Sequence, residues 1–266
     1  MLLAHFEERD RAWLLAHPED AVSEPAALER ALARRAAGEP IAYIRGFKEW
    51  RSLRIKTDPR ALIPRPETEL LADAAIREVA ATLAQTDVPV VAWEVATGSG
   101  AVAVVLALEF REALQSGRLT LIATDLSPDA AELAAENVAA HGVGGSVNLE
   151  GGDLLEAAGA RLPRPDVIIA NLPYVATAEV DTAAGSLAHE PRLALDGGPD
   201  GLDIIRRLLD EVPTRAAPAA TVLLEIGTDQ AAVVRALAPA GASVSFEADL
   251  AGIPRVVRIG LSDSNA

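Results

Sequence analysis

The stretch VPVVAWEVATGSG, residues 88–100, decides the fold of this chain. A short apolar run rich in valine is typical of a buried strand, and here it ends in a turn with two glycines. Apolar residues resume at once from Ala101 to Leu108, as in a buried helix. Glycines at such a turn let the backbone pass close to a ligand, and ligands of open α/β sheets bind at the carboxyl ends of the strands. The stretch therefore predicts a strand, a binding turn and a helix.

The same alternation of apolar strand and amphipathic helix continues after the turn. It predicts a parallel sheet with helices on both of its faces, which is an α/β fold of Rossmann-like type. Pro64 and Pro66 bar a helix before residue 69, so the segment there is expected to be stiff and extended. The expected helices cover residues 69–84, 100–109, 128–140 and about 202–211, and the expected strands cover residues 88–95, 119–124, 147–150, 166–170, 221–226, 242–247 and 256–260.

Two smaller segments are expected to precede the α/β domain. Residues 1–40 are predicted to be a helical N-terminal domain, with two short helices around the break at Pro18. Residues 41–61 are predicted to be a β-hairpin linker, because apolar and charged residues alternate there. The α/β domain is then expected to span residues 62–266.

The composition excludes several classes of protein. The chain has 266 residues, half of them apolar, with no cysteine and four scattered histidines, so we expect no disulfide, no thiolate and no metal site. The longest apolar run has eight residues, far below the roughly 20 that span a bilayer, and the first residues are too acidic for a secretory signal. The sequence predicts a cytoplasmic protein with no membrane partner.

The net charge of −15 is unevenly distributed along the chain. Residues 1–70 carry 12 acidic and 12 basic side chains, so the whole excess belongs to residues 71–266. Within the neutral part, the segment from Arg45 to Arg65 has seven basic residues against two acidic ones. This segment could dock a protein partner, or it could be a ribbon with solvated charges, and the sequence leaves both open.

Two carboxylates follow the second and third strands. Asp125 ends the second strand, and because Ser127 can cap the next helix, Asp125 is expected to be free to hold a ribose diol. Asp153 follows the third strand at the same edge, although it also suits a turn after two glycines. A nicotinamide dinucleotide and S-adenosyl-L-methionine both require such an acid, and residues 98–103 also match the dinucleotide fingerprint.

Asn171-Leu172-Pro173-Tyr174 ends the fourth strand of the sheet. Asparagine and proline form turns and tyrosine often covers a sheet edge, so a structural role is one reading. The second reading is a planar clamp, in which Asn171 Oδ1 and the Leu172 carbonyl accept both hydrogens of one NH2 group while Tyr174 packs on its face. Such a clamp suits an amino group on an sp2 carbon.

The chain resembles the protein-(glutamine-N5) methyltransferases that act on peptide chain release factors. The most specific pieces are Pro64-Arg65-Pro66-Glu67-Thr68-Glu69 and Glu190-Pro191-Arg192-Leu193-Ala194-Leu195-Asp196-Gly197-Gly198. The other matching pieces are Gly38 to Tyr43, Thr97 to Gly100, Asn171 to Tyr174, Leu224 to Gly227 and Asp249 to Arg255.

The resemblance implies a seven-stranded class I methyltransferase domain that binds S-adenosyl-L-methionine and methylates a glutamine, in the Gly-Gly-Gln loop of a release factor. It also implies that the chain begins about a helix or two inside the family's N-terminal domain. By this analogy the cofactor residues are Ala96, Thr97, Gly98, Ser99 and Gly100 beneath the methionine part, Asp125 at the ribose, Asp153 with Leu154 at the adenine, and Asn171. The substrate glutamine is held by Asn171, Leu172, Pro173 and Tyr174, of which Asn171, Pro173 and Tyr174 are catalytic.

Three residues depart from the family pattern. Ala96 stands where the family usually has glycine, Leu172 where it usually has proline, and Leu154 where some members have an aromatic residue. The first narrows the approach to the cofactor, the second gives a less rigid turn, and the third a thinner wall at the adenine.

Three rival functions are weighed against this one. An adenine-N6 methyltransferase of RNA or DNA also uses Asn-Leu-Pro-Tyr, but the −15 excess lies in the lobe that would face phosphates. A nicotinamide-dependent oxidoreductase gives the Asn171 to Tyr174 segment no role. A non-catalytic S-adenosylmethionine-binding relative, disabled at Ala96 and Leu172, is the third.

Overall fold

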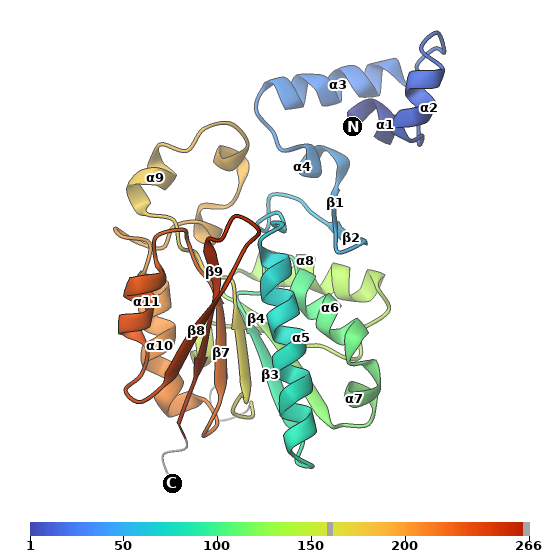
Figure 1. The fold of residues 1–266 in the computed structure, drawn as a ribbon. Coiled ribbons are helices and arrows are strands. Elements are labelled where there is room, and N and C mark those ends of the chain that lie inside the picture. The colour runs from blue at the N-terminus through green and yellow to red at the C-terminus, as the bar shows by residue number, and fades with distance from the viewer. Residues whose placement is uncertain (159–161, 263–266) are drawn as a thin grey trace.

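A computed structural model describes residues 1–158 and 162–262 of the chain (Figure 1). Its main sheet has seven strands in the order β5-β4-β3-β6-β7-β9-β8. The first five of these are parallel, and β9 is antiparallel to both β7 and β8. The strands are β1 (Phe47–Trp50), β2 (Leu53–Lys56), β3 (Val90–Val95), β4 (Leu119–Asp125), β5 (Asn148–Gly151), β6 (Val167–Ala170), β7 (Thr221–Glu225), β8 (Ser243–Ala248) and β9 (Pro254–Gly260).

Helices cover both faces of this sheet, as the alternating pattern predicts. One buried cluster joins α5, α6 and α8 to the sheet, and a second joins α10 and α11 to its other face. Figure 1 shows the two helical layers on either side of the strands. The helices are α1 (Leu2–Phe6), α2 (Arg11–Ala16), α3 (Pro25–Ala36), α4 (Ile41–Arg45), α5 (Thr68–Gln85), α6 (Ala101–Glu109), α7 (Arg111–Gln115), α8 (Pro128–Ala140), α9 (Thr177–Asp181), α10 (Asp203–Arg215) and α11 (Ala231–Leu237).

The segment before the sheet differs from the sequence prediction in two places. Residues 1–37 form three helices rather than two, because the Asp10 carboxylate caps a separate helix α2 by accepting the Trp13 amide. The expected hairpin of residues 41–61 begins later, since residues 41–45 form the short helix α4, which ends at Gly46 in the left-handed region. The hairpin itself is limited to β1 and β2. The short helices α7, α9 and α11 were also not predicted.

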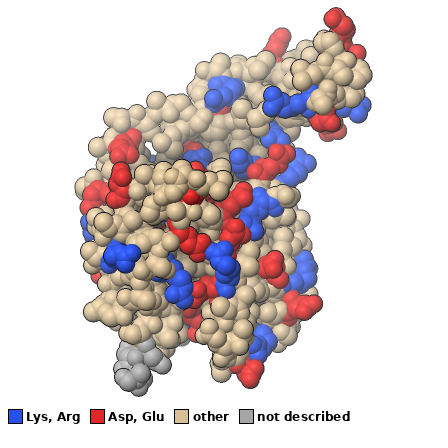
Figure 2. All heavy atoms as spheres, viewed as in Figure 1, with Lys and Arg blue, Asp and Glu red and all other residues tan. Residues whose placement is uncertain are grey.

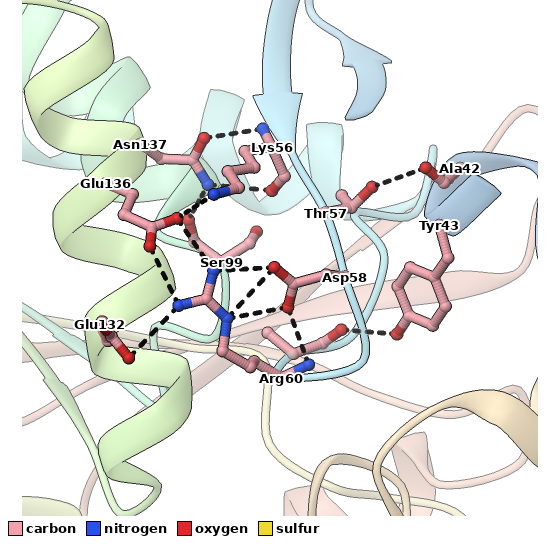
Figure 3. Close-up of polar contacts among 11 residues, drawn as sticks. Ala42, Tyr43, Lys56, Thr57, Asp58, Arg60, Ser99, Glu132, Glu136 and Asn137 are labelled. Atoms are coloured by element: carbon pink, nitrogen blue, oxygen red, sulfur yellow. Dashed lines mark hydrogen bonds and ion pairs between the residues drawn. The ribbon is translucent and has the colours of Figure 1, made fainter. Parts of the chain in front are cut away.

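One buried asparagine joins the hairpin to the main domain (Figure 3). Asn137 lies on α8 and is fully buried. Its Oδ1 accepts the Lys56 amide at 2.7 Å, and its Nδ2 donates to the carbonyls of Lys56 and Ser99 at 3.0 and 2.8 Å. A single side chain therefore fixes the end of β2 and the turn after β3 to the same helix.

Most of the basic residues between Arg45 and Arg65 are paired within the chain. Arg60 bonds Asp58 and Glu136, and Lys56 also bonds Glu136 at 2.6 Å. Arg51 pairs with Asp73, Arg65 pairs with Glu190, and the guanidiniums of Arg45 and Arg54 lie over the Phe47 ring. Figure 2 shows basic and acidic side chains interleaved on this face. Most of these basic side chains therefore have partners within the chain, which argues against a free basic surface for docking a protein partner.

Replacing Asn137 with leucine should destabilise the protein. The change leaves two backbone groups of Lys56 and one of Ser99 without partners, which should lower the free energy of unfolding by about 2 kcal/mol. Urea unfolding of Asn137→Leu measures the loss, with Asn148→Ala, at an exposed residue of β5, as the control. Equal stability of the two variants would contradict this role.

Candidate functional site

A pocket opens where β3, β4 and β6 end. Its wall combines the turn after β3, the residues after the other two strands, and parts of the segments before α5 and α10. The residues that line it are Arg60, Ala61, Leu62, Pro64, Arg65, Thr68, Glu94, Val95, Ala96, Thr97, Gly98, Ser99, Ala101, Val102, Asp125, Leu126, Ser127, Ala130, Gly152, Asp153, Leu154, Asn171, Leu172, Pro173, Pro191, Leu193, Ala194, Asp196, Ile204 and Arg207.

The turn after β3 has the backbone shape that its glycines suggest. Gly98 has φ of +56°, and a Cβ built there would meet no atom within 4 Å. Gly100 serves packing instead, because its Cβ would approach Ala134 of α8 at 3.0 Å. Ala96 also has φ of +56°. This left-handed conformation explains why glycine suits the position, since an alanine there is strained by about 1 kcal/mol.

Asp125 holds the turn in place. Its Oδ2 accepts the Gly98 amide at 2.8 Å and its Oδ1 accepts the Ser127 amide at 2.8 Å. Ser127 caps α8 through Ala130, as expected, yet Asp125 is not free in the way the sequence suggests. Each carboxylate oxygen accepts more than one hydrogen bond, so capacity remains for the two hydroxyls of a ribose. Burial raises the pKa of the Asp125 carboxyl.

Glu94 is a buried carboxyl directly beneath the turn. It is 5% exposed, and its Oε2 accepts the Thr97 hydroxyl at 2.7 Å. Burial raises its pKa to about 8. The side chain lines the pocket, although the sequence analysis gave it no role. Its position near the end of the first strand of the main sheet could have indicated that Glu94 lies at the pocket.

Asp153 and Leu154 lie on the β5 side of the pocket. Asp153 Oδ2 accepts a bond from Arg207 Nη2 of α10 at 2.6 Å. Leu154 is 5% exposed with φ of +45°, so a leucine is held in the left-handed region. Together with Leu126 and Ile204, Leu154 gives this end of the pocket apolar walls. No pattern in the sequence indicates that Arg207 belongs to the pocket, because it lies 54 residues away from Asp153.

Hydrogen bonds to α5 and β7 hold the residues that follow β6. Asn171 Nδ2 donates to the Thr68 hydroxyl at 3.1 Å, and the Tyr174 hydroxyl donates to Glu225 Oε1 at 3.2 Å. Burial raises the pKa of Tyr174, so its hydroxyl keeps the proton. Leu172 is 2% exposed. The Asn171 and Pro173 side chains reach the pocket, whereas Tyr174 is not among the residues that line it.

Two glycines allow the segment 197–201 to press against the backbone of this turn. A Cβ at Gly197 would lie 2.6 Å from the Pro173 carbonyl oxygen, and one at Gly201 would lie 2.3 Å from that of Tyr174. The Gly197 amide also donates to the Val175 carbonyl at 2.9 Å. The close approach at Gly197 explains the first glycine of the Asp-Gly-Gly piece as a backbone support.

An ion pair ties the Glu-Pro-Arg piece to the Pro-Arg-Pro piece. Glu190 has a side chain that is 1% exposed, and its two oxygens accept Arg65 Nη2 at 2.6 Å and the Ile63 amide at 3.1 Å. Pro191 and Leu193 follow and line the pocket. The two longest motifs of the sequence therefore meet at one buried carboxylate beside the pocket.

The structure thus brings together ten of the predicted site residues. These are Ala96, Thr97, Gly98, Ser99, Asp125, Asp153, Leu154, Asn171, Leu172 and Pro173. Gly100 and Tyr174 stand behind the wall in supporting positions. Three further residues of the pocket wall were not predicted from the sequence, namely Thr68, which lies within the Pro64 to Glu69 motif, Glu94 and Arg207.

The residues present fit S-adenosyl-L-methionine. The open turn at Gly98 offers backbone contacts, Asp125 keeps acceptor capacity for a diol, and apolar side chains line the β5 side. Two solved structures share the fold. The first is a ribosomal protein L11 methylase from Lactobacillus delbrueckii, with a TM-score of 0.52 and 20% sequence identity; the match covers 78% of this chain and 85% of that chain. The second is the N-terminal domain of human METTL16 in complex with SAH, with a TM-score of 0.53 and 13% sequence identity; the match covers 88% of this chain and 84% of that chain.

The fold and the pocket define a class I S-adenosyl-L-methionine-dependent methyltransferase. Residues 1–46 match the model of the PrmC N-terminal domain. Over 260 residues the chain is 41% identical to the release factor glutamine methyltransferase of Bordetella pertussis, which covers 96% of this chain and 91% of that protein. The chain belongs to the release factor glutamine methyltransferase family. Within the two described ranges, no helix is both long and apolar enough to cross a membrane.

Replacing Ala96 with glycine should stabilise the protein. Glycine adopts the left-handed region without strain, and this outweighs its larger entropy in the unfolded chain, so the free energy of unfolding should rise by about 0.5 to 1 kcal/mol. Urea unfolding measures the change. In the control Ala139→Gly, at an exposed position of α8, the free energy of unfolding should fall by a similar amount. Destabilisation by both changes would contradict the strain at Ala96.

Glu94 should make the protein less stable as the pH rises. Its pKa is about 8 in the folded chain against 4.5 for an exposed glutamate, so stability falls between these values by up to about 1.4 kcal/mol per pH unit. In Glu94→Gln this fall should be reduced, and the variant should be more stable than the parent at pH 9. Melting temperatures from pH 5 to 9 test it, with the exposed Glu112→Gln as control. Parallel curves for all three proteins would refute the assignment.

Proposed function

We propose that this protein transfers the methyl group of S-adenosyl-L-methionine to the side-chain amide nitrogen N5 of a glutamine in a peptide chain release factor, within the Gly-Gly-Gln loop. Membership of the release factor glutamine methyltransferase family supports the substrate. The observation that carries the proposal is the Asn171 amide, whose nitrogen is occupied by Thr68 so that its oxygen is left to accept an NH2 hydrogen. The sulfonium of the bound cofactor would supply an electrophilic methyl group.

The residues of the turn after β3 would hold the cofactor. The backbone from Ala96 to Ser99 would lie beneath its methionine part, and Asp125 would accept the ribose hydroxyls. Asp153 and Leu154 would border the adenine, where the Arg207 guanidinium fixes the Asp153 carboxylate. These assignments follow the pocket wall and the family resemblance together.

The residues after β6 would hold the substrate glutamine. An amide nitrogen is a weak nucleophile because its lone pair is delocalised into the carbonyl group. Asn171 Oδ1 and the Leu172 carbonyl would accept both of its hydrogens, which raises electron density on nitrogen and aims it along one line. The nitrogen would gain a bond to the methyl carbon as the bond between that carbon and the sulfonium sulfur breaks, which leaves a neutral thioether as the leaving group, and the extra proton on nitrogen would pass to water. Pro173 would stiffen the turn, and Tyr174, whose hydroxyl donates to Glu225, would support the turn from outside the pocket wall.

Labelling identifies the acceptor. The protein is incubated with a release factor, with RNA and with S-adenosyl-L-methionine that carries a labelled methyl group, and the label is mapped by mass spectrometry. Label on a glutamine of the release factor is the expected result. Label in RNA alone would favour an adenine-N6 methyltransferase. A bound cofactor with no transfer to either would favour a non-catalytic relative.

Replacing Asn171 with alanine should abolish transfer. The change removes one acceptor for the substrate NH2, and the rate of methyl transfer should fall by at least about 100-fold. Circular dichroism and calorimetric binding of S-adenosyl-L-methionine check that the variant folds and keeps its pocket. The exposed Asn148→Ala serves as the control with full activity. Turnover retained in Asn171→Ala would exclude the proposed role.

A further inference from the structure

One glutamine outside the pocket wall bonds three backbone segments. Gln230 is the residue before α11 and is half-buried. Its Nε2 donates to the Tyr174 carbonyl at 2.9 Å and to the Gly201 carbonyl at 3.2 Å. Its Oε1 accepts the Gly227 amide at 2.9 Å. The side chain therefore joins the turn after β6 to the segment before α10 and to the turn after β7.

The three partners fix the orientation of this amide. A backbone N–H only donates, so the Gly227 amide has to face the oxygen of Gln230. A backbone carbonyl only accepts, so the other two partners have to face its NH2 group, which has one hydrogen for each of them. A reversed amide would set oxygen against two oxygens and NH2 against N–H. The amide therefore has a single orientation, in which both of its hydrogens are used.

Two glycines bring Gln230 close to the turn after β6. A Cβ at Gly201 would lie 3.0 Å from Gln230 Nε2, and one at Gly227 would lie 3.1 Å from Gln230 Oε1 and 3.5 Å from Tyr174 Cδ2. Any larger residue at Gly201 or Gly227 would push the amide away from its partners. The contact with the Tyr174 backbone thus depends on close packing around one side chain.

The Leu172 carbonyl belongs to a segment that needs support from outside. Residues 171–174 form neither helix nor strand, and Leu172 has no ring that would fix its φ. The next residues are tied to other loops, as where the Val175 amide donates to the Leu195 carbonyl at 2.9 Å. Gln230 holds the carbonyl of Tyr174, only two residues after Leu172. A shift of the Tyr174 backbone would therefore also move the Leu172 carbonyl.

We propose that Gln230 is a positioning residue for methyl transfer, which holds the Tyr174 backbone so that the Leu172 carbonyl keeps its place in the clamp. The inference rests on the proposed function, in which this carbonyl accepts one hydrogen of the substrate NH2. Gln230 does not line the pocket, so it acts through the backbone. Cofactor binding should not depend on it, because Asp125 and Asn137 hold the turn after β3.

Two variants test the amide of Gln230. Gln230→Met keeps the length of the side chain and removes all three hydrogen bonds. Gln230→Glu keeps an acceptor for the Gly227 amide but removes both donors, so it isolates the bonds to the two carbonyls. Gln115→Met and Gln115→Glu are the matched controls, because Gln115 is an exposed residue of α7. The readouts are kcat and KM with the release factor, the calorimetric Kd for S-adenosyl-L-methionine, and the melting temperature.

Both Gln230 variants should lower kcat by about 10- to 100-fold and change the Kd for the cofactor by less than about threefold. Both Gln115 variants should keep kcat within about threefold of the parent. Equal kcat in Gln230→Met and the parent would overturn the proposal. So would full kcat in Gln230→Glu, since the donor to Tyr174 is then dispensable, or a loss of kcat seen only near the melting temperature.

A second readout needs no turnover. The backbone amides of Val175 and Thr97 each donate to a carbonyl at 2.9 Å, so their hydrogen exchange reports separately on the turn after β6 and on the turn after β3. In Gln230→Met, Val175 should exchange at least about tenfold faster than in the parent, and Thr97 within about threefold of it. Unchanged exchange at Val175, or equal acceleration at both amides, would overturn the proposal. Acceleration confined to Val175 in a protein whose parent methylates no release factor would instead overturn the proposed function, and the hold of Gln230 on Tyr174 would stand.

Discussion

The parallel register of β3 with its two neighbours is the constraint on which the site depends. Val95 of β3 lies opposite Thr124 of β4 and also opposite Ala170 of β6. The three strands therefore end side by side, and the residues that follow each strand lie together at the same edge of the sheet. Because a parallel sheet buries both faces, the strands themselves carry no polar side chain that could do this work except at their ends. The site is a consequence of strand ends that coincide.

Three buried carboxyl groups lie at or near strand ends and hold the neighbouring loops in place. Glu94, Asp125 and Glu225 each have a raised pKa because burial removes water from the carboxyl group. Each accepts a hydrogen bond from a loop that follows a strand end, so a carboxyl group that is costly to bury holds that loop in place. Local hydrogen bonds offset part of the cost for the first two. Glu225 keeps one oxygen unpaired, and its cost remains the least compensated.

The sequence predicted the sheet, the turn after β3 and the position of Asn171 at a strand end because each is a local pattern. Period and glycine position identify a strand and its turn, and Asn171 is recognisable from its place at a strand end. The supports were out of reach, since Tyr174 meets Glu225 only when β7 is known to lie beside β6. The sequence could not show that Asp125 also accepts the Gly98 amide for a related reason, because that amide belongs to the turn of the neighbouring strand. The alternation at residues 41–45 predicted a strand, but Gly46 closes a helical turn there.

Charge within the linker follows from the same need to fix segments against the sheet. Arg60 and Lys56 of the linker meet acidic side chains of α8, and Asn137 on that helix bonds the backbone of both β2 and the turn after β3. Partly exposed ion pairs of this kind add little stability on their own, whereas the buried amide specifies one position of the hairpin. Much of the basic excess between Arg45 and Arg65 is thus paired with acidic side chains of the same chain.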